Sequence, residues 1–271
     1  MNAKFTLLGT GGWIPTVRRE TTCAILSFPE ALFIFDAGTG LARLLEERFR
    51  PELEPGREVH LFLTHYHLDH IAGLVYLPAM FKGRTVHLHP PAASVTGVDP
   101  LETIDSIVRK PFNPASLAGM PVNISVEPLD EGGHEIEGIA VRVRRQIHPD
   151  PSVAYRIADL LVFATDTAAD PATAEFSRGA QLLVHEAWID GAEEDDPATE
   201  HIARETYVGH TSARQAAGLA QLAGVDELVL CHLSPVRGAD YHNRMLAAAQ
   251  EIFPRTMILE DGESIEFKTE K

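Results

Sequence analysis

The sequence has 271 residues but only two cysteines, no apolar stretch of membrane-spanning length and no secretion signal at its start. Cys23 and Cys231 are far apart and form no Cys-x-x-Cys motif, so we expect two free thiols in a reducing compartment. A membrane span needs roughly 18 consecutive apolar residues, and a signal peptide needs a charged region before a long apolar one. We therefore expect a cytoplasmic protein without a membrane partner.

Positive charge is scarce as well. The chain has 23 lysines and arginines against 39 aspartates and glutamates, which gives a formal net charge of −16. An acidic chain opposes non-specific binding of nucleic acid, because that affinity comes largely from lysine and arginine on the phosphates. The balance makes nucleic acid a less favoured partner, although it does not exclude a local basic pocket.

Several sequence features of other protein classes are missing too. The glycine-rich segment 9–12 lacks the Lys-Ser/Thr of a P-loop and the spacing of a dinucleotide fingerprint, so we expect a tight turn there rather than a phosphate cradle. The chain shows no repeat, no low-complexity linker and no shift in composition. We therefore expect one domain that spans residues 1–271.

A dense group of metal-ligand residue types follows the apolar run 59–63, which we expect to be a buried strand. His65 and His67 are two residues apart, so in extended backbone they share a face and can reach one ion. Asp69 and His70 follow the turn before an expected helix at 71–77 and can face a second ion. Imidazole and carboxylate together suit zinc, and also manganese or iron. The spacing predicts a metal site.

Further ligand residue types follow other apolar strands later in the chain. Pro149 biases His148 toward an extended backbone after the expected strand 139–145. Asp166 follows the apolar strand 160–164, where a carboxylate costs free energy unless it is paired or bound to metal. His232 follows the expected strand 227–230. The repeated placement of such residues after strands favours one shared site.

The cluster from His65 to His70 resembles the signature of the metallo-β-lactamase superfamily of metallohydrolases, and the resemblance covers nearly the whole chain. It implies the α/β class, as a four-layer αββα sandwich of two mixed β-sheets with outer helices. It also implies two divalent ions, Zn²⁺ or else Mn²⁺ or Fe²⁺, with Asp166 as the bridge. By this likeness the first ion is held by His65, His67 and His148, and the second by Asp69, His70 and His232.

Other segments resemble supporting elements of that superfamily. Asp36, in Asp-Ala-Gly, resembles an acid that lies beneath the metals and orients the ligands, although a turn or helix-cap role is the alternative. The segment 185–188 resembles the His-Glu-Ala-Thr element of tRNA 3′-processing endonucleases, with Trp188 in place of threonine, and 209–212 resembles their Gly-His-Ser-Thr element. By this likeness His210 contacts or protonates the scissile phosphate, Glu186 orients His210, and His185 lies behind the ligands. The alternative for His210 is an ordinary histidine before a helix.

The resemblance narrows the function to the phosphodiesterase branch. The segments 21–23, 36–41 and 154–157 resemble small cyclic-phosphodiesterase relatives, and no lysine-rich or Gly/Pro-rich arm for gripping tRNA is present. Our first expectation is therefore a dinuclear hydrolase of a small anionic phosphodiester, cyclic ones included. A metal hydroxide would attack while Asp69 relays a proton. The alternatives are an RNase Z-like endoribonuclease acting on RNA 3′ ends, a thioester or lactone hydrolase, and a non-catalytic metal-binding protein.

Some further expectations concern substrate contacts and local structure. Lys110, Phe112 and Ser234 are candidate substrate contacts, and the chain is compatible with a homodimer. Ser212, Gln215 and Gly224 predict a helix at 213–223 that opens with a capping box and stops at glycine. We also expect a helix at 41–50, a hairpin of 21–28 with 31–35, a second-sheet strand at 122–126, and a closing hairpin of 256–259 with 264–267.

Overall fold

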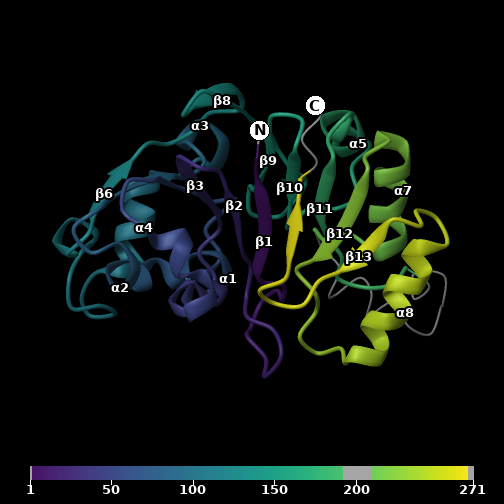
Figure 1. The fold of residues 1–271 in the computed structure, drawn as a ribbon, viewed down its shortest axis with the longest axis horizontal. Helices are drawn as coiled ribbons and strands as arrows, with labels where there is room; N and C mark the ends of the chain where they lie inside the picture. The colour runs from purple at the N-terminus through teal and green to yellow at the C-terminus, as the bar shows by residue number, and fades with distance from the viewer. Residues whose placement is uncertain (1, 192–208, 268–271) are drawn as a thin grey trace. The chain divides into compact units, whose positions relative to one another are not determined.

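The computed structural model describes residues 2–191 and 209–267 (Figure 1). Their contacts define two compact units. Unit 1 comprises residues 1–10, 14–130 and 260–271, and unit 2 comprises residues 11–13 and 131–259. Each unit contains one seven-stranded mixed β-sheet. The chain is therefore of the α/β class, as predicted, whereas the single domain and the stacking of four layers stay predictions.

The sheet of unit 1 has the strand order β14-β1-β2-β3-β4-β5-β6. Strands β14 to β3 pair antiparallel, and β3 to β6 pair parallel. Phe35 is in register with Phe62, so β3 and β4 end at the same edge of the sheet. The strands are β1 (Lys4–Gly9), β2 (Cys23–Ser27), β3 (Ala31–Phe35), β4 (Glu58–Phe62), β5 (Thr85–His89), β6 (Asn123–Val126) and β14 (Ser264–Glu266).

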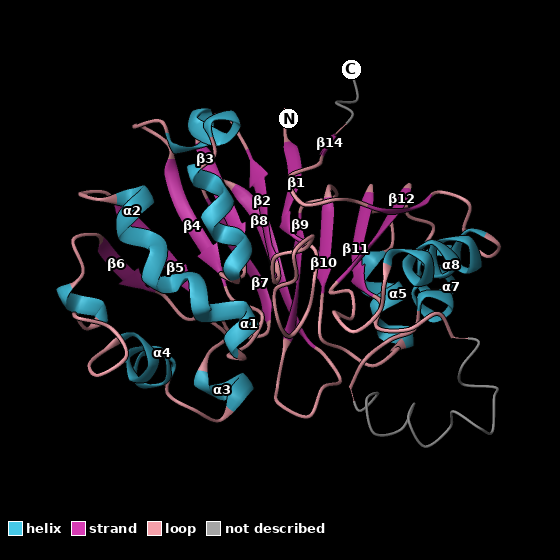
Figure 2. Ribbon diagram, turned by 90° about the horizontal axis from the view of Figure 1, so that it is seen from below, coloured by secondary structure: helices cyan, strands magenta, loops and turns pink. Residues whose placement is uncertain are grey.

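Helices pack on one face of this sheet (Figure 2). Alternate strand residues, such as Leu32 and Ile34 of β3, join the helices in one buried cluster, as the two-residue period of a strand requires. The opposite face carries Phe33, Phe35 and Phe62, whose rings lie 5.1 and 5.5 Å apart. The helices are η1 (Thr39–Leu45), η2 (Glu47–Leu53), α1 (Leu68–Ile71), η3 (Ala72–Tyr76), α2 (Leu77–Phe81), α3 (Ala93–Thr96), α4 (Pro100–Val108) and η4 (Leu117–Gly119).

The sheet of unit 2 has the order β13-β12-β11-β10-β9-β8-β7. Strands β10 to β13 are parallel, and β9 is antiparallel to both β8 and β10. Strands β8, β10, β11 and β12 therefore all end at one edge of the sheet. The strands are β7 (Gly132–Ile136), β8 (Ile139–Arg145), β9 (Val153–Ile157), β10 (Leu161–Ala164), β11 (Leu182–Glu186), β12 (Glu227–Cys231) and β13 (Thr256–Ile258).

Helices α5 (Pro171–Ser177), α7 (Ala213–Ala223) and α8 (Ala239–Gln250) run beside these parallel strands (Figure 1). The prediction for α7 is confirmed in detail. Ser212 and Gln215 form a reciprocal capping box, and Gly224 ends the helix with a left-handed backbone. The hairpin of β2 and β3 is confirmed as well. None of the described helices combines the length and the apolar character that crossing a bilayer requires.

Three local predictions are wrong. Residues 41–50 fall in two short 3₁₀ helices rather than one helix, because the extended backbone of Glu46 separates them. Strand β6 pairs with β5 in the first sheet, not in the second. Strands β13 and β14 form no hairpin, since β13 pairs with β12 and β14 pairs with β1.

The expected hairpin turn has a different partner. Asp261 accepts hydrogen bonds from the Thr10 backbone N–H at 3.0 Å, the Thr10 hydroxyl at 2.6 Å and the Glu20 N–H at 2.7 Å. These bonds hold both ends of the segment 11–19. The Asp-Gly pair does form a local turn, in which the Glu263 N–H donates to the Glu260 carbonyl at 3.1 Å, but the Asp261 side chain holds the segment after β1 rather than joining β13 to β14.

Candidate metal centre

The ligand candidates of unit 1 lie directly after β4, with His65 and His67 in a loop and Asp69 and His70 in α1, which begins at Leu68 rather than at the expected residue 71. His67 caps α1 with an extended backbone, so the chain turns between it and Asp69. The ring of His65 lies 4.5 Å from that of His67 and 4.3 Å from that of His70. Asp69 Oδ2 lies 3.4 Å from His70 Nε2. This segment therefore brings three imidazoles and a carboxylate together, a donor set that suits a divalent transition metal.

Asp36 supports this loop from the end of β3. Its buried carboxylate accepts hydrogen bonds from the Thr64 N–H at 2.7 Å, the Thr64 hydroxyl at 2.9 Å and His70 Nδ1–H at 2.8 Å. Burial raises the pKa of Asp36, while the hydrogen bonds to His70 and Thr64 oppose that rise. Donation from Nδ1 places the lone pair of His70 on Nε2, the tautomer that a metal ligand needs.

The ligand candidates of unit 2 lie at the ends of different strands. Asp166 follows β10 and His232 follows β12, and Asp166 Oδ1 lies 3.4 Å from His232 Nε2. Both residues have left-handed backbones, with φ of 53° and 51°. Asp36 in unit 1 shares this feature, with φ of 57°. Such angles are uncommon outside glycine and concentrate at functional sites, and they turn each side chain abruptly off its strand.

Glu186, the last residue of β11, joins this group to His210. One carboxylate oxygen accepts His210 Nδ1–H at 2.8 Å, and the other accepts a short hydrogen bond from the Thr167 N–H. Glu186 is fully buried. Because its second oxygen is already occupied, Glu186 holds the His210 ring in one orientation, with Nε2 as the nitrogen that faces away from the carboxylate.

Trp188 packs against the imidazoles of this group. Its ring stacks on His210 at 4.7 Å with an interplanar angle of 14°, and it lies 5.5 Å from the ring of His232. The backbone N–H of Trp188 also donates to the Thr211 carbonyl at 2.9 Å. The sequence offered a signal for this contact, because Trp188 replaces a threonine of the resembled element, but its packing role was not predicted.

His148 approaches the same group after β8. Its Nδ1–H donates to the Asp150 carbonyl at 2.7 Å, which again leaves the lone pair on Nε2. Gly209 has φ of 92°, and a Cβ there would lie 2.8 Å from His148 Cδ2. Glycine is thus required both for the turn and for the close approach of His148 to the segment that carries His210.

The donor atoms of unit 2 fit a metal ion. Ligand atoms of His148, Asp166 and His210 all lie within 4.8 Å of one another, and so do those of Glu186, His210 and His232. Each group combines imidazole nitrogen with carboxylate oxygen, as zinc, manganese and iron sites do. His210 was predicted to act on the phosphate, and its place in both groups was not foreseen from the sequence.

The remaining predicted site residues belong to none of these ligand groups. His185 donates to the Glu186 carbonyl at 2.9 Å, and burial lowers its pKa. Adjacent strand residues face opposite sides of a sheet, so His185 points away from the side of Glu186. Ser234 is buried, and Lys110 and Phe112 follow α4 on the surface, where Phe112 is 76% exposed. Their substrate contacts stay predictions.

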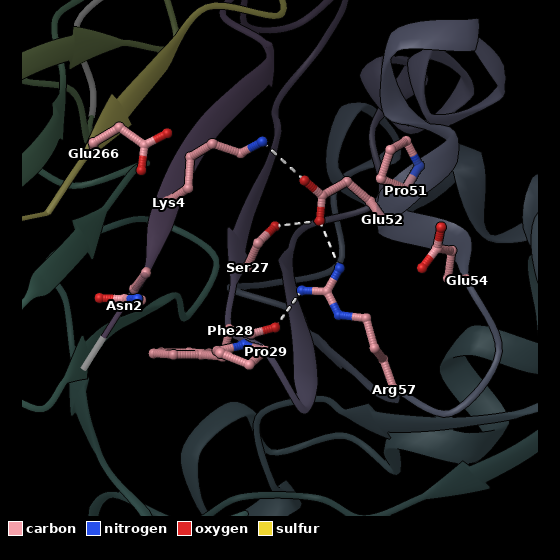
Figure 3. Close-up of a pocket in the computed structure, with 11 residues that line it drawn as sticks. Asn2, Lys4, Ser27, Phe28, Pro29, Pro51, Glu52, Glu54, Arg57 and Glu266 are labelled. Atoms are coloured by element: carbon pink, nitrogen blue, oxygen red, sulfur yellow. Dashed lines mark hydrogen bonds and ion pairs between the residues drawn. The ribbon is translucent and has the colours of Figure 1, made fainter.

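One cavity of about 390 Å³ lies in unit 1, and none of the ligand candidates lines it (Figure 3). Glu52 lies at its centre and accepts hydrogen bonds from Ser27 Oγ at 2.6 Å and from Arg57 Nη1 at 2.7 Å. Lys4 Nζ lies 3.0 Å from the same carboxylate. The cations of this cavity are therefore already paired with an acid of the chain, which indicates a structural ion-pair network.

Known proteins resemble this chain over most of its length. Residues 32–233 match the family model described as "Beta-lactamase superfamily domain". The chain is 28% identical to a ribonuclease Z of Brevibacillus brevis, over 98% of this chain and 97% of that protein. It is also 28% identical to a ribonuclease Z of Methanothermobacter thermautotrophicus, over 97% and 96% of the two chains.

Solved structures show the same fold. The metallo-β-lactamase fold protein YhfI of Bacillus subtilis superposes with a TM-score of 0.73 at 20% identity, over 98% of this chain and all of that one. The short form of human tRNase Z superposes with a TM-score of 0.70 at 19% identity, over 97% and 98% of the two chains. The predicted metallo-β-lactamase fold is thereby confirmed.

Proposed function

Because the chain belongs to the beta-lactamase superfamily and is a metal-dependent hydrolase, we propose that it is a phosphodiesterase that cleaves RNA at 3′ ends, as an RNase Z-like endoribonuclease. The full-length likeness to proteins named ribonuclease Z carries this proposal. It reverses the order of our first expectation, which favoured a small phosphodiester. The pairing of Glu186 with His210 supports it chemically, because it sets a proton donor beside candidate ligands.

The proposal includes the predicted ligand set. His65, His67, Asp69 and His70 of unit 1 and His148, Asp166 and His232 of unit 2 would hold two divalent ions. Bound metal would supply positive charge for the phosphate and bring the pKa of a water toward about 7. Asp36 would orient His70 through the hydrogen bond described above, and this support is of the kind that typically sustains metal affinity.

The chain's own residues would then carry the proton transfers. Asp69 would accept the proton of the attacking water. As the bond from phosphorus to the leaving oxygen breaks, His210 would give the proton on Nε2 to that oxygen. Glu186 would stabilise the imidazolium through its hydrogen bond to Nδ1, which is 2.8 Å long. The stacked ring of Trp188 would keep the His210 ring in the orientation that this transfer needs.

A small phosphodiester remains the second candidate substrate, and one observation favours it. The alignment with the Brevibacillus relative spans 326 positions, whereas this chain has 271 residues, so at least 55 positions of the alignment have no counterpart here. A shorter chain with a net charge of −16 offers less surface and less positive charge to a large RNA.

A cleavage assay with metal-replete protein separates the two candidates. We expect the wild-type protein to remove the trailer from a tRNA precursor. Asp166→Ala should lower the cleavage rate by roughly 100-fold or more, and it should also lower the amount of bound metal, which mass spectrometry measures. His87→Ala is the matched control, since His87 pairs with Glu127 outside the ligand groups.

Two results would count against the proposal. Intact precursor beside rapid hydrolysis of a cyclic nucleotide would replace RNA by the small substrate. Equal rates and equal metal content for wild type and Asp166→Ala would refute the ligand set itself.

A further inference from the structure

A short N-terminal segment of unit 2 runs along the end of β12. Gly11 bridges Leu233 in parallel register, and the Gly12 N–H donates to the Leu233 carbonyl at 3.1 Å. A Cβ on Gly12 would lie 2.5 Å from the imidazole of His232. The backbone before Trp13 therefore touches the ring of a proposed metal ligand, and only glycine allows that approach.

Trp13 itself combines two unusual properties. Its side chain is 60% exposed, and its backbone has φ of 62°. A left-handed backbone is a genuine outlier for so bulky a residue and persists only where the surroundings hold it. An indole that is mostly exposed adds little to the core, and glycine or asparagine would occupy this backbone conformation with less strain.

We propose that Trp13 is a stacking platform for a nucleobase of the substrate, next to the phosphate that is cleaved. The inference rests on the proposed phosphodiesterase function and assigns to Trp13 the contact with a base of its substrate. Aromatic side chains bind bases through their faces with little dependence on sequence. Gly12, the residue before Trp13, packs on His232, so a nucleotide stacked on Trp13 would place its phosphate near the proposed metals.

The charge of the chain makes such a platform useful. Most nucleic-acid affinity comes from lysine and arginine on phosphates, and this chain carries a net charge of −16. Stacking needs no positive charge and survives at high salt. Trp188, the other tryptophan, is only 9% exposed and packs on His210 and His232, so the two indoles have different surroundings.

The first test compares two substrates with one leaving group. Thymidine 5′-(p-nitrophenyl phosphate) carries a base, and methyl p-nitrophenyl phosphate does not. We expect Trp13→Ala to lower the ratio of kcat/KM for the base-bearing over the base-free substrate by roughly 5- to 100-fold. Trp13→Phe should restore most of the ratio. Leu222→Ala, which truncates an exposed side chain of α7, should leave the ratio at the wild-type value.

Trp13→Asn provides a variant whose folding is not in question. Asparagine tolerates the left-handed backbone, so this variant should melt no lower than wild type and still lose the ratio. Equal losses for both substrates in the alanine and asparagine variants would overturn the inference, because Trp13 would then act only as a support for His232.

A binding test separates this inference from the proposed function. Adenosine monophosphate should quench the tryptophan fluorescence of wild type, whereas ribose 5-phosphate should not. In Trp13→Phe, the remaining fluorescence comes from Trp188, and adenosine monophosphate should no longer quench it. Quenching without hydrolysis of any phosphodiester would refute the proposed function and leave the platform in place. No difference between the two ligands, or none between wild type and Trp13→Phe, would refute the platform.

Discussion

The two ligand groups are built in opposite ways. In unit 1 the candidates follow one another in a single segment, from His65 in a loop to His70 in α1, and one buried carboxylate supports them. In unit 2 the candidates come from residues far apart in the chain, and the parallel ends of β8, β10, β11 and β12 gather them. A contiguous group depends on local backbone turns, whereas a dispersed group depends on the register of a whole sheet.

The supports of the two groups differ as well. Asp36 accepts three hydrogen bonds from two residues of the unit 1 loop. In unit 2, Glu186 accepts two, and the stacked ring of Trp188 adds a contact that involves no hydrogen bond to the imidazole. We therefore expect the loss of Asp36 to destabilise the fold more than the loss of Glu186 does.

The largest effect on activity should come from the dispersed group. His210→Ala removes the proposed proton donor, so kcat/KM for a phosphodiester should fall by roughly 10²- to 10⁴-fold. Bound metal should fall less than it does in Asp166→Ala, which separates a proton donor from a ligand. Steady-state kinetics with metal analysis measures both, and a fall of less than about 3-fold would contradict the proposed role.

The contrast between the supporting acids should be visible in stability. Asp36→Ala leaves three buried donors without their acceptor, so the free energy of unfolding should fall by roughly 3 kcal/mol or more. Glu186→Ala leaves two, so its loss should be smaller, about 2 kcal/mol. Urea unfolding in the presence of a chelator compares the two variants without metal. A larger loss of unfolding free energy in Glu186→Ala than in Asp36→Ala would contradict this prediction.

The smallest effect should come from the stacked indole. Trp188→Ala removes a ring contact of the kind that contributes about 0.5–1.5 kcal/mol, so kcat should fall by roughly 2- to 10-fold with little change in KM. Trp188→Phe keeps a flat ring and should recover most of that loss. A rise in KM at constant kcat would instead assign Trp188 to substrate binding.

Local patterns predicted the elements whose signals are complete within a few residues. Helix α7 carries its start signal in Ser212 and Gln215 and its stop signal in Gly224, so it was placed residue by residue. Strands β2 and β3 are short and mostly apolar, and their predicted hairpin was placed correctly too. The final strands β13 and β14 were each located, but their partners lie more than 25 residues away in different sheets, so the local Asp-Gly turn was misleading.

The sequence alone determined which residue types stand at the ends of strands, because apolar runs and the polar residues after them are local properties. It thereby determined the family and the contiguous ligand loop. Only the tertiary structure decided that β8, β10, β11 and β12 end at one edge, that Trp188 stacks on His210, and that Trp13 follows a glycine packed on His232. The reason is physical: these contacts join residues whose proximity is set by hydrogen-bonded register between distant segments, and no short window of sequence contains that register.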